Sequence, residues 1–333
     1  MTDATQLPDA RIAGAPLLRT FAWSVVSVLF VYLINCYLTF WQNWPGVVSL
    51  LESPRPVSNL SWVQAAFYVA AVLISAWYAF ATASERTLRQ DSETLNDVSV
   101  FIVCAAFWSV FLIGLVDAVI SFMRVEGFLE DVVGAEFAKQ LSRSRFRGPY
   151  IHMPLVLVGI GIAIFRRRID FIWLALLVVL AELAIVISRF IFSYEQAFMG
   201  DLVRFWYAAL FLFASAYTLY TDAHVRVDVF YASFSRPTRG SVNAVGAIIL
   251  GMVFCWTILV MGMWSKSSIL ITPLLGFEVS QSGFGMYIKY LMASFLSVFA
   301  VTMMIQFASS LLESAADVRG DPGARVIESE NLH

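Results

Sequence analysis

The chain has few charged residues, few histidines and few cysteines, and these shortages exclude several classes of protein. Of its 333 residues only 14% are Asp, Glu, Lys or Arg, whereas 59% are hydrophobic and the mean hydropathy is +0.75. Soluble globular domains carry roughly 25% charged residues. The composition therefore predicts an integral membrane protein.

Cysteine and histidine are too scarce and too scattered for a metal centre. Cys36, Cys104 and Cys255 each lie in an apolar segment, without the paired spacing of a disulfide framework or a zinc site. A membrane haem needs two histidines at suitable depths within helices, but the three histidines fall at a helix mouth, in a loop and at the C-terminus. We therefore predict no metal site and no cofactor.

Motifs for enzymatic chemistry and for nucleic-acid binding are also missing. The sequence has no glycine-rich phosphate loop, no paired-histidine helix motif, and no serine or cysteine nucleophile with a nearby base. The net charge is −2, and no basic tract is present. We therefore predict that the protein is not an enzyme and does not bind nucleic acid.

Long apolar runs dominate what is present. A transmembrane helix needs about 20 apolar residues, and eight segments are candidates: 18–41, 61–83, 97–123, 149–165, 170–193, 203–221, 243–265 and 286–312. The segment 149–165 is the weakest, because it is short and carries His152 and two prolines, so it either spans with little tilt or lies partly re-entrant. The predicted fold is an all-α integral membrane protein with about eight transmembrane helices plus interfacial amphipathic helices.

The arginines and lysines predict how the chain is oriented. With the N-terminus inside, most of them fall in cytoplasmic loops, as the positive-inside rule requires. We therefore expect both termini to be cytoplasmic. One loop, 124–148, conflicts with this orientation, because it would face outward with five basic residues: Arg124, Lys139, Arg143, Arg145 and Arg147. The conflict disappears if 149–165 does not span, since the N-terminal half then inverts.

The run of arginines at 166–168 divides the predicted helices into two groups of four. Residues 1–169 form an N-terminal group, in which the segment 124–141 shows apolar residues at helical spacing and suits the membrane interface. Residues 170–315 form the second group, with an interfacial segment near 224–240. Residues 316–333 are a polar C-terminal tail.

Glu182, Arg189 and Asp117 are charged residues within predicted spans, where charge is costly and usually functional. Glu182 lies near the middle of 170–193, Arg189 follows on roughly the same helical face, and Asp117 lies at a depth similar to that of Arg189. These depths allow an Asp117–Arg189 ion pair as a structural contact between helices. A proton or ion relay would need acids at successive depths, and only Glu182 and Asp117 are available.

The stretch YTLYTDAHVRVDVFY, residues 217–231, alternates ionisable residues with valines directly behind an apolar run. His224, Arg226 and Asp228 are predicted to mark a cytoplasmic helix end that turns into the interfacial segment. In a helix, His224 and Asp228 can pair because they are four residues apart, while Arg226 reaches lipid phosphates.

Together with the following SRPTRGSVNAVGAIILGM, residues 235–252, this stretch resembles the signature of the small membrane subunit of TRAP transporters. These are the DctQ-like proteins of the bacterial tripartite ATP-independent periplasmic carriers. Arg189 stands where the family has an arginine after its first helix. Asp201 stands at one position of a family acidic pair whose other position is Gly200 here.

A second stretch, FEVSQSGFGMYIKY, residues 277–290, is similar to the loop before the family's last helix. Its matching positions include Glu278, Ser280, Gly283, Tyr287 and Lys289. The resemblance covers about 170–315, so the first 165 residues form an N-terminal extension that we expect to add scaffold surface.

The resemblance implies a scaffold function. In this family the small subunit works with a larger multi-helix transport subunit and a soluble periplasmic substrate-binding protein that delivers an organic acid, and uptake is driven by sodium. We therefore expect this chain to lie in the bacterial inner membrane, among lipids, and to brace the large subunit. The resemblance implies partner contact through His224, Arg226, Asp228, Arg189 and Asp201. It also suggests that the outer loop, including Lys266, Glu278, Ser280, Tyr287 and Lys289, contacts the binding protein.

The alternative function is that of a self-sufficient membrane channel or small carrier. It would use Asp117, Glu182 and Arg189 around a wet cavity and would work without partners.

Overall fold

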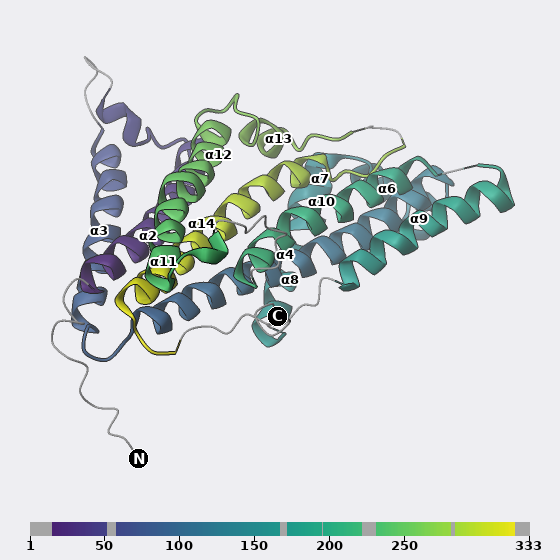
Figure 1. Cartoon of the computed structure of the whole chain (residues 1–333). Coiled ribbons are helices and arrows are strands. Elements are labelled where there is room, and N and C mark those ends of the chain that lie inside the picture. Colours follow the sequence, from purple (N-terminus) through teal and green to yellow (C-terminus); the bar gives the residue numbers. More distant parts are fainter. Residues whose placement is uncertain are drawn as a thin grey trace. The chain divides into compact units, whose positions relative to one another are not determined.

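The computed structural model describes residues 15–51, 58–166, 172–194, 196–221, 231–280 and 284–323 (Figure 1). These residues form helices and their connections, and no strand occurs among them. The predicted all-α fold is confirmed.

Among the described residues, the helices of eleven or more residues are α2 (Ala15–Phe40), α3 (Asn59–Ala81), α4 (Leu88–Val125), α8 (Met153–Phe165), α9 (Ile172–Phe192), α10 (Ala197–Tyr220), α11 (Arg236–Gly246), α12 (Val253–Met263) and α14 (Lys289–Arg319). The shorter elements are η1 (Val47–Leu50), α5 (Leu129–Val133), α6 (Ala135–Leu141), α7 (Ser144–Arg147), η2 (Gly148–His152), η3 (Tyr231–Ser233), η4 (Ala247–Met252) and α13 (Ile271–Gly276). Two of these, η2 and η4, are π-helical turns inside longer helical runs.

Seven helical runs among the described residues are long and apolar enough to cross a membrane. One of them is the continuous run Ser144–Phe165, formed by α7, η2 and α8, which contains the doubtful segment 149–165. Helix α9 has 21 residues, which at 1.5 Å per residue is also sufficient for the hydrocarbon core. An integral membrane protein built from helices, as predicted, is confirmed.

The chain forms two compact units. The first contains residues 1–98, 218–257 and 303–333, and the second contains residues 99–217 and 258–302. Each unit therefore combines segments from before and after residue 170. Because α4 and α14 are long, each of them contributes to both units.

Buried ion pairs join the helices of the first unit. Arg19 on α2 is fully buried, and its Nε lies 2.6 Å from a carboxylate oxygen of Asp91 on α4. Arg19 also donates to the carbonyl oxygens of Ala79 and Thr82 at the end of α3. A buried charge is tolerated only when it is paired and hydrogen-bonded, so Arg19 and Asp91 determine where α2, α3 and α4 meet.

The start of α4 is also bonded to the end of α14. Arg89 forms ion pairs with Glu313 and with Asp317, the latter at 2.8 Å. One turn further along, the hydroxyl of Ser92 lies 2.9 Å from the carbonyl oxygen of Ser309. The first unit thus connects the N-terminal part of the chain with its last helix.

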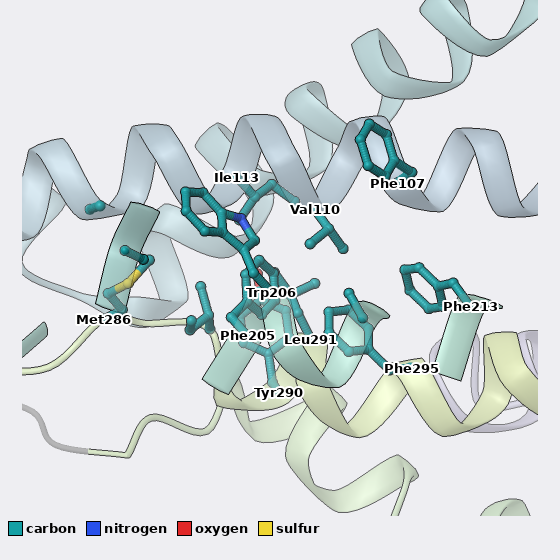
Figure 2. Close-up of a cluster of buried hydrophobic side chains, with 14 of the residues drawn as sticks. Phe107, Val110, Ile113, Phe205, Trp206, Phe213, Met286, Tyr290, Leu291 and Phe295 are labelled. Carbon is teal, nitrogen blue, oxygen red and sulfur yellow. The ribbon is translucent and has the colours of Figure 1, made fainter. Parts of the chain in front are cut away.

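The second unit is built around a buried apolar core (Figure 2). On one side of this core lie three residues of α4: Phe107, Val110 and Ile113. They face aromatic side chains of α10 and of the region around the start of α14, and the figure labels five of these: Phe205, Trp206, Phe213, Tyr290 and Phe295. Helix α8 packs on α4 through small residues, because a Cβ added at Gly159 would lie 2.6 Å from the backbone nitrogen of Ser109. Close backbone approach at glycine is a common way to associate membrane helices.

This close approach makes Gly159 a test of the packing. We expect Gly159→Ala to lower the midpoint of thermal unfolding in detergent by several degrees, because overpacking costs about 1–3 kcal/mol. The matched control is Gly161→Ala, two residues along the same helix, where an added Cβ meets no described atom within 4 Å. Equal unfolding midpoints for the two variants would contradict the α4–α8 packing.

Candidate functional site

A fully buried carboxylate, that of Asp117 on α4, is the centre of a polar cluster in the second unit. One of its oxygens, Oδ1, accepts a hydrogen bond from Arg147 Nη1 at 2.7 Å and lies 3.1 Å from His152 Nε2. The other, Oδ2, accepts from the backbone N–H of Tyr287 at 2.8 Å. The side chains of Asp117, Arg147 and His152 have no solvent exposure, so the carboxylate has only partners from within the chain.

The π-turn η2 places two of these partners on the same side of the helix. Its hydrogen bond runs from the N–H of Met153 to the carbonyl oxygen of Gly148, five residues back. Residues five apart stack above each other in a π-turn, whereas in an α-helix they point in different directions. Arg147, which precedes the turn, and His152, which ends it, can therefore both reach Asp117.

The cluster extends to α14 through the imidazole ring of His152. Nδ1 of His152 lies 2.7 Å from the hydroxyl of Tyr290, which is 1% exposed. With one ring proton on Nε2, His152 donates to Asp117 and accepts from Tyr290, so every member of the chain Tyr290–His152–Asp117 has a compatible partner. Such a connected buried network specifies one arrangement of the helices that carry it.

Three consecutive residues before α14, the 285–287 segment, are held by side chains of α4 and α10. Arg124 donates to the carbonyl oxygen of Gly285 at 2.7 Å. Asp201 accepts from the N–H of Met286 at 3.1 Å, and Asp117 accepts from the N–H of Tyr287. These three backbone groups lie before α14 and have no partner within the helix, so the side chains supply their hydrogen bonds.

The ring of Tyr287 adds a second set of contacts to the same segment. The guanidinium groups of Arg124 and Arg147 lie 4.5 Å and 4.4 Å from its centroid, within the range of cation–π interaction. Its hydroxyl donates to the carbonyl oxygen of Ser142 at 3.0 Å. The 285–287 segment is therefore fixed to α4 and to the short helices that follow α4.

The partner of Asp117 differs from the sequence prediction. The predicted Asp117–Arg189 ion pair is wrong, because both carboxylate oxygens of Asp117 are hydrogen-bonded to Arg147, His152 and Tyr287 instead. Arg189 instead lies exposed near the end of α9, and Glu182 lies exposed at its middle.

Asp201, predicted from the family pattern, is brought into the same region. It is 7% exposed, and besides the bond to Met286 it lies 3.5 Å from Arg204 on its own helix. The other residues of that family motif, His224, Arg226 and Asp228, lie outside the described residues.

The predicted outer loop combines exposed and buried positions. Lys289 and Glu278 form an exposed ion pair at 3.0 Å, and Lys266 and Ser280 are exposed. Tyr287 is 3% exposed, so its burial does not suit the predicted contact with a binding protein, and it serves to anchor the loop.

Two residues of the cluster were missed by the sequence analysis, which assigned Arg147 to a loop and His152 to a helix mouth. Their burial changes the charge count of the loop 124–148. Of the five basic residues in conflict with the positive-inside rule, Arg147 is fully buried against Asp117, and Arg124 donates to Gly285. Neither is a free loop charge of the kind that the rule counts.

The predicted interfacial helix at 124–141 is two short helices, α5 and α6. They are separated by Gly134, whose φ of 81° breaks the helix. Leu129 and Leu141 pack on Ile120 of α4, whereas Phe128 and Phe137 are exposed. Part of the predicted apolar face therefore packs against α4, and the rest is exposed.

The helical spans and the internally paired charges define an α-helical membrane protein that crosses the bilayer several times. Residues 175–317 match the model of a protein family described as the DctQ component of tripartite ATP-independent periplasmic transporters. The resemblance predicted from the sequence is confirmed over these residues, which make up less than half of the chain. The helices that precede α9 lie outside the match. Comparisons with curated proteins and with solved structures gave no match.

The buried cluster joins the matched region to the residues that precede it. Asp201, Met286, Tyr287 and Tyr290 lie inside 175–317, whereas Asp117, Arg124, Arg147 and His152 lie before it. The additional helices therefore supply Asp117 and Arg124, which hold the 285–287 segment together with Asp201 of the matched region.

Replacing Asp117 by asparagine tests this dependence. Asp117→Asn leaves Arg147 buried without its carboxylate, and breaking a buried pair costs about 3–5 kcal/mol. We expect faster amide hydrogen exchange at Met286 and Tyr287, measured by mass spectrometry, and a lower unfolding midpoint.

The matched control is Asp91→Asn, which makes the same change to an equally buried aspartate of α4 in the first unit. It should destabilise the protein but leave the exchange at Met286 and Tyr287 as in the wild type. Equal acceleration at these amides in both variants would show that Asp117 has no specific effect on the 285–287 segment.

Proposed function

We propose that this chain is the scaffold subunit of a sodium-coupled TRAP transporter in a bacterial inner membrane. In this proposal it braces a larger transport subunit, which takes up an organic acid delivered by a periplasmic binding protein. The observation that carries the proposal is the match of residues 175–317 to the DctQ component.

The state of Asp117 supports a scaffold over a self-sufficient channel or carrier. A residue that serves an ion or solute path must face water or exchange its partners. Asp117 has no solvent exposure, and both of its oxygens are bonded within the chain. Asp117 is therefore better suited to holding helices together than to transport.

Helix α14 is long enough to cross the bilayer. It begins at Lys289, where the outer loop ends, and its 31 residues correspond to roughly 46 Å of helix at 1.5 Å per residue, more than the hydrocarbon core of about 30 Å. This length is consistent with an outer loop that meets a periplasmic protein.

The described residues that follow the family motif are firmly held at the end of α14. Arg236 begins α11 and forms an ion pair with Asp317 at 2.8 Å. A Cβ added at Gly240 would lie 2.7 Å from the carbonyl oxygen of Ser314, so α11 packs closely on α14. We propose that His224, Arg226 and Asp228, which precede this anchor in the sequence, contact the large subunit on the cytoplasmic side. Arg189 and Asp201 are proposed as further contacts with the large subunit on the outer side.

The outer loop is proposed to receive the binding protein. Its charged and polar residues, exposed at Lys266, Ser280 and Lys289 and half-buried at Glu278, suit the polar rim of a transient interface. The buried anchor at Tyr287 holds the end of this loop in place, which lowers the cost of ordering it on binding.

The experiment that tests the proposed function is reconstitution with the other two components. The chain is expressed alone and with a candidate large subunit, purified, weighed as the detergent-solubilised species, and assayed for sodium-driven uptake into liposomes. We expect a complex that transports only when the binding protein is added. A stable lone chain that moves solute by itself would overturn the scaffold function.

The family motif gives a more specific prediction. We expect Arg226→Ala and Asp228→Ala each to reduce the amount of large subunit that co-purifies with the chain by several-fold, because each removes a charged contact. Lys139→Ala, at an exposed position on α6, is the control and should leave co-purification unchanged. Unaltered assembly and uptake in both motif variants would refute the partner contact.

A further inference from the structure

Helix α9 carries an exposed carboxylate at its centre. Glu182 has ten residues of the helix on each side, and these flanks are almost entirely apolar. The side chain is exposed, as are Val179 and Val186 one turn before and after it, at 60% and 59%. If α9 spans the membrane, this carboxylate lies close to the middle of the bilayer, on a surface that the described residues leave uncovered.

A carboxylate in that position is costly when lipid surrounds it. Charged residues at mid-membrane depth nearly always face protein or water, and they pair with other groups. The chain treats its other membrane carboxylate in this way, since Asp117 is fully buried and bonded to Arg147. Glu182, by contrast, makes no hydrogen bond or ion pair with a described residue.

The position of Glu182 on the helix defines a stripe. Val179, Glu182, Val186 and Arg189 follow one another at intervals of three and four residues, so they share one side of α9. The adjacent side is covered, because Leu177, Val178 and Ala181 pack into the core of the second unit. The stripe therefore borders the protein core and is open outward.

We propose that the 179–189 stripe is the surface on which the large transport subunit docks, and that this subunit presents a cation or hydrogen-bond donor to Glu182 at mid-membrane depth. The identity of the partner rests on the proposed function. The proposal is consistent with the position of Glu182 inside the matched region 175–317.

Charge complementarity argues against a second copy of this chain on the same stripe. A two-fold axis along the membrane normal keeps every residue at its own depth. Two copies would then place Glu182 against Glu182, and like charges at close range repel each other. A different chain with a donor at that depth does not meet this repulsion.

The proposal predicts effects of opposite sign for the lone chain and for the complex. Glu182→Leu should raise the unfolding midpoint of the lone chain, because an exposed carboxylate is removed from an apolar surface. In the complex the same change should weaken assembly by tenfold or more, since the donor of the partner is left without its acceptor. Glu182→Gln, which keeps an acceptor, should lose less affinity than Glu182→Leu.

Cysteine cross-linking locates the surface independently of stability. Val179→Cys and Val186→Cys place a thiol on the stripe, and Leu180→Cys and Ile187→Cys place one about 100° further around α9, at positions that are also exposed. The three natural cysteines are buried, so a thiol-attached photo-cross-linker reports the introduced site. We expect links to the large subunit from positions 179 and 186 but not from 180 and 187.

The outcomes separate this inference from the proposed function. If the wild-type chain forms no complex with the large subunit, the proposed function fails and the inference fails with it. If the wild-type complex forms but Glu182→Leu binds equally well, only the inference is overturned. Equal cross-linking from both pairs of positions on α9, links within the chain, or links to a second copy would also overturn it.

Discussion

The pairing of charge inside an apolar protein is the constraint on which this structure depends. A carboxylate such as that of Asp117 cannot be left alone away from water, because its desolvation costs several kcal/mol. Arg147, His152 and the N–H of Tyr287 all meet at this one group. Helix α4, the π-turn η2 and the start of α14 are consequently held in one arrangement.

The same constraint acts a second time on α4, near its other end. Asp91 pairs with Arg19, and 26 residues, roughly 39 Å of helix, separate it from Asp117. In each unit, a buried aspartate of α4, ahead of the DctQ-like region, thus pairs with another segment of the chain. In the first unit Arg89 also forms ion pairs with Glu313 and Asp317. The additional helices therefore supply ionic contacts to the last helix.

The sequence was sufficient for features that depend on local composition. Apolar length predicts the spans, and the residues 217–252 and 277–290 indicate the family, which the match over 175–317 confirms. The partner of Asp117 was not predictable in this way, because helical periodicity defines a face but does not show which distant segment covers it. Arg147 and His152 reach Asp117 only through a π-turn, and a hydrophobic pattern gives no sign of one. The break at Gly134 between α5 and α6 was missed for a related reason, since the apolar spacing continues across it.

The difference between Asp117 and Glu182 connects the architecture to the function proposed for it. A scaffold subunit must be stable within itself and must also retain a surface that only its partner completes. Asp117 meets the first requirement, since its partners all come from its own chain. Glu182 suits the second, because it lies exposed at the centre of an apolar helix whose neighbouring side is already packed. An apolar surface alone would accept lipid as readily as protein, whereas an exposed carboxylate at that depth favours a partner that brings a matching donor.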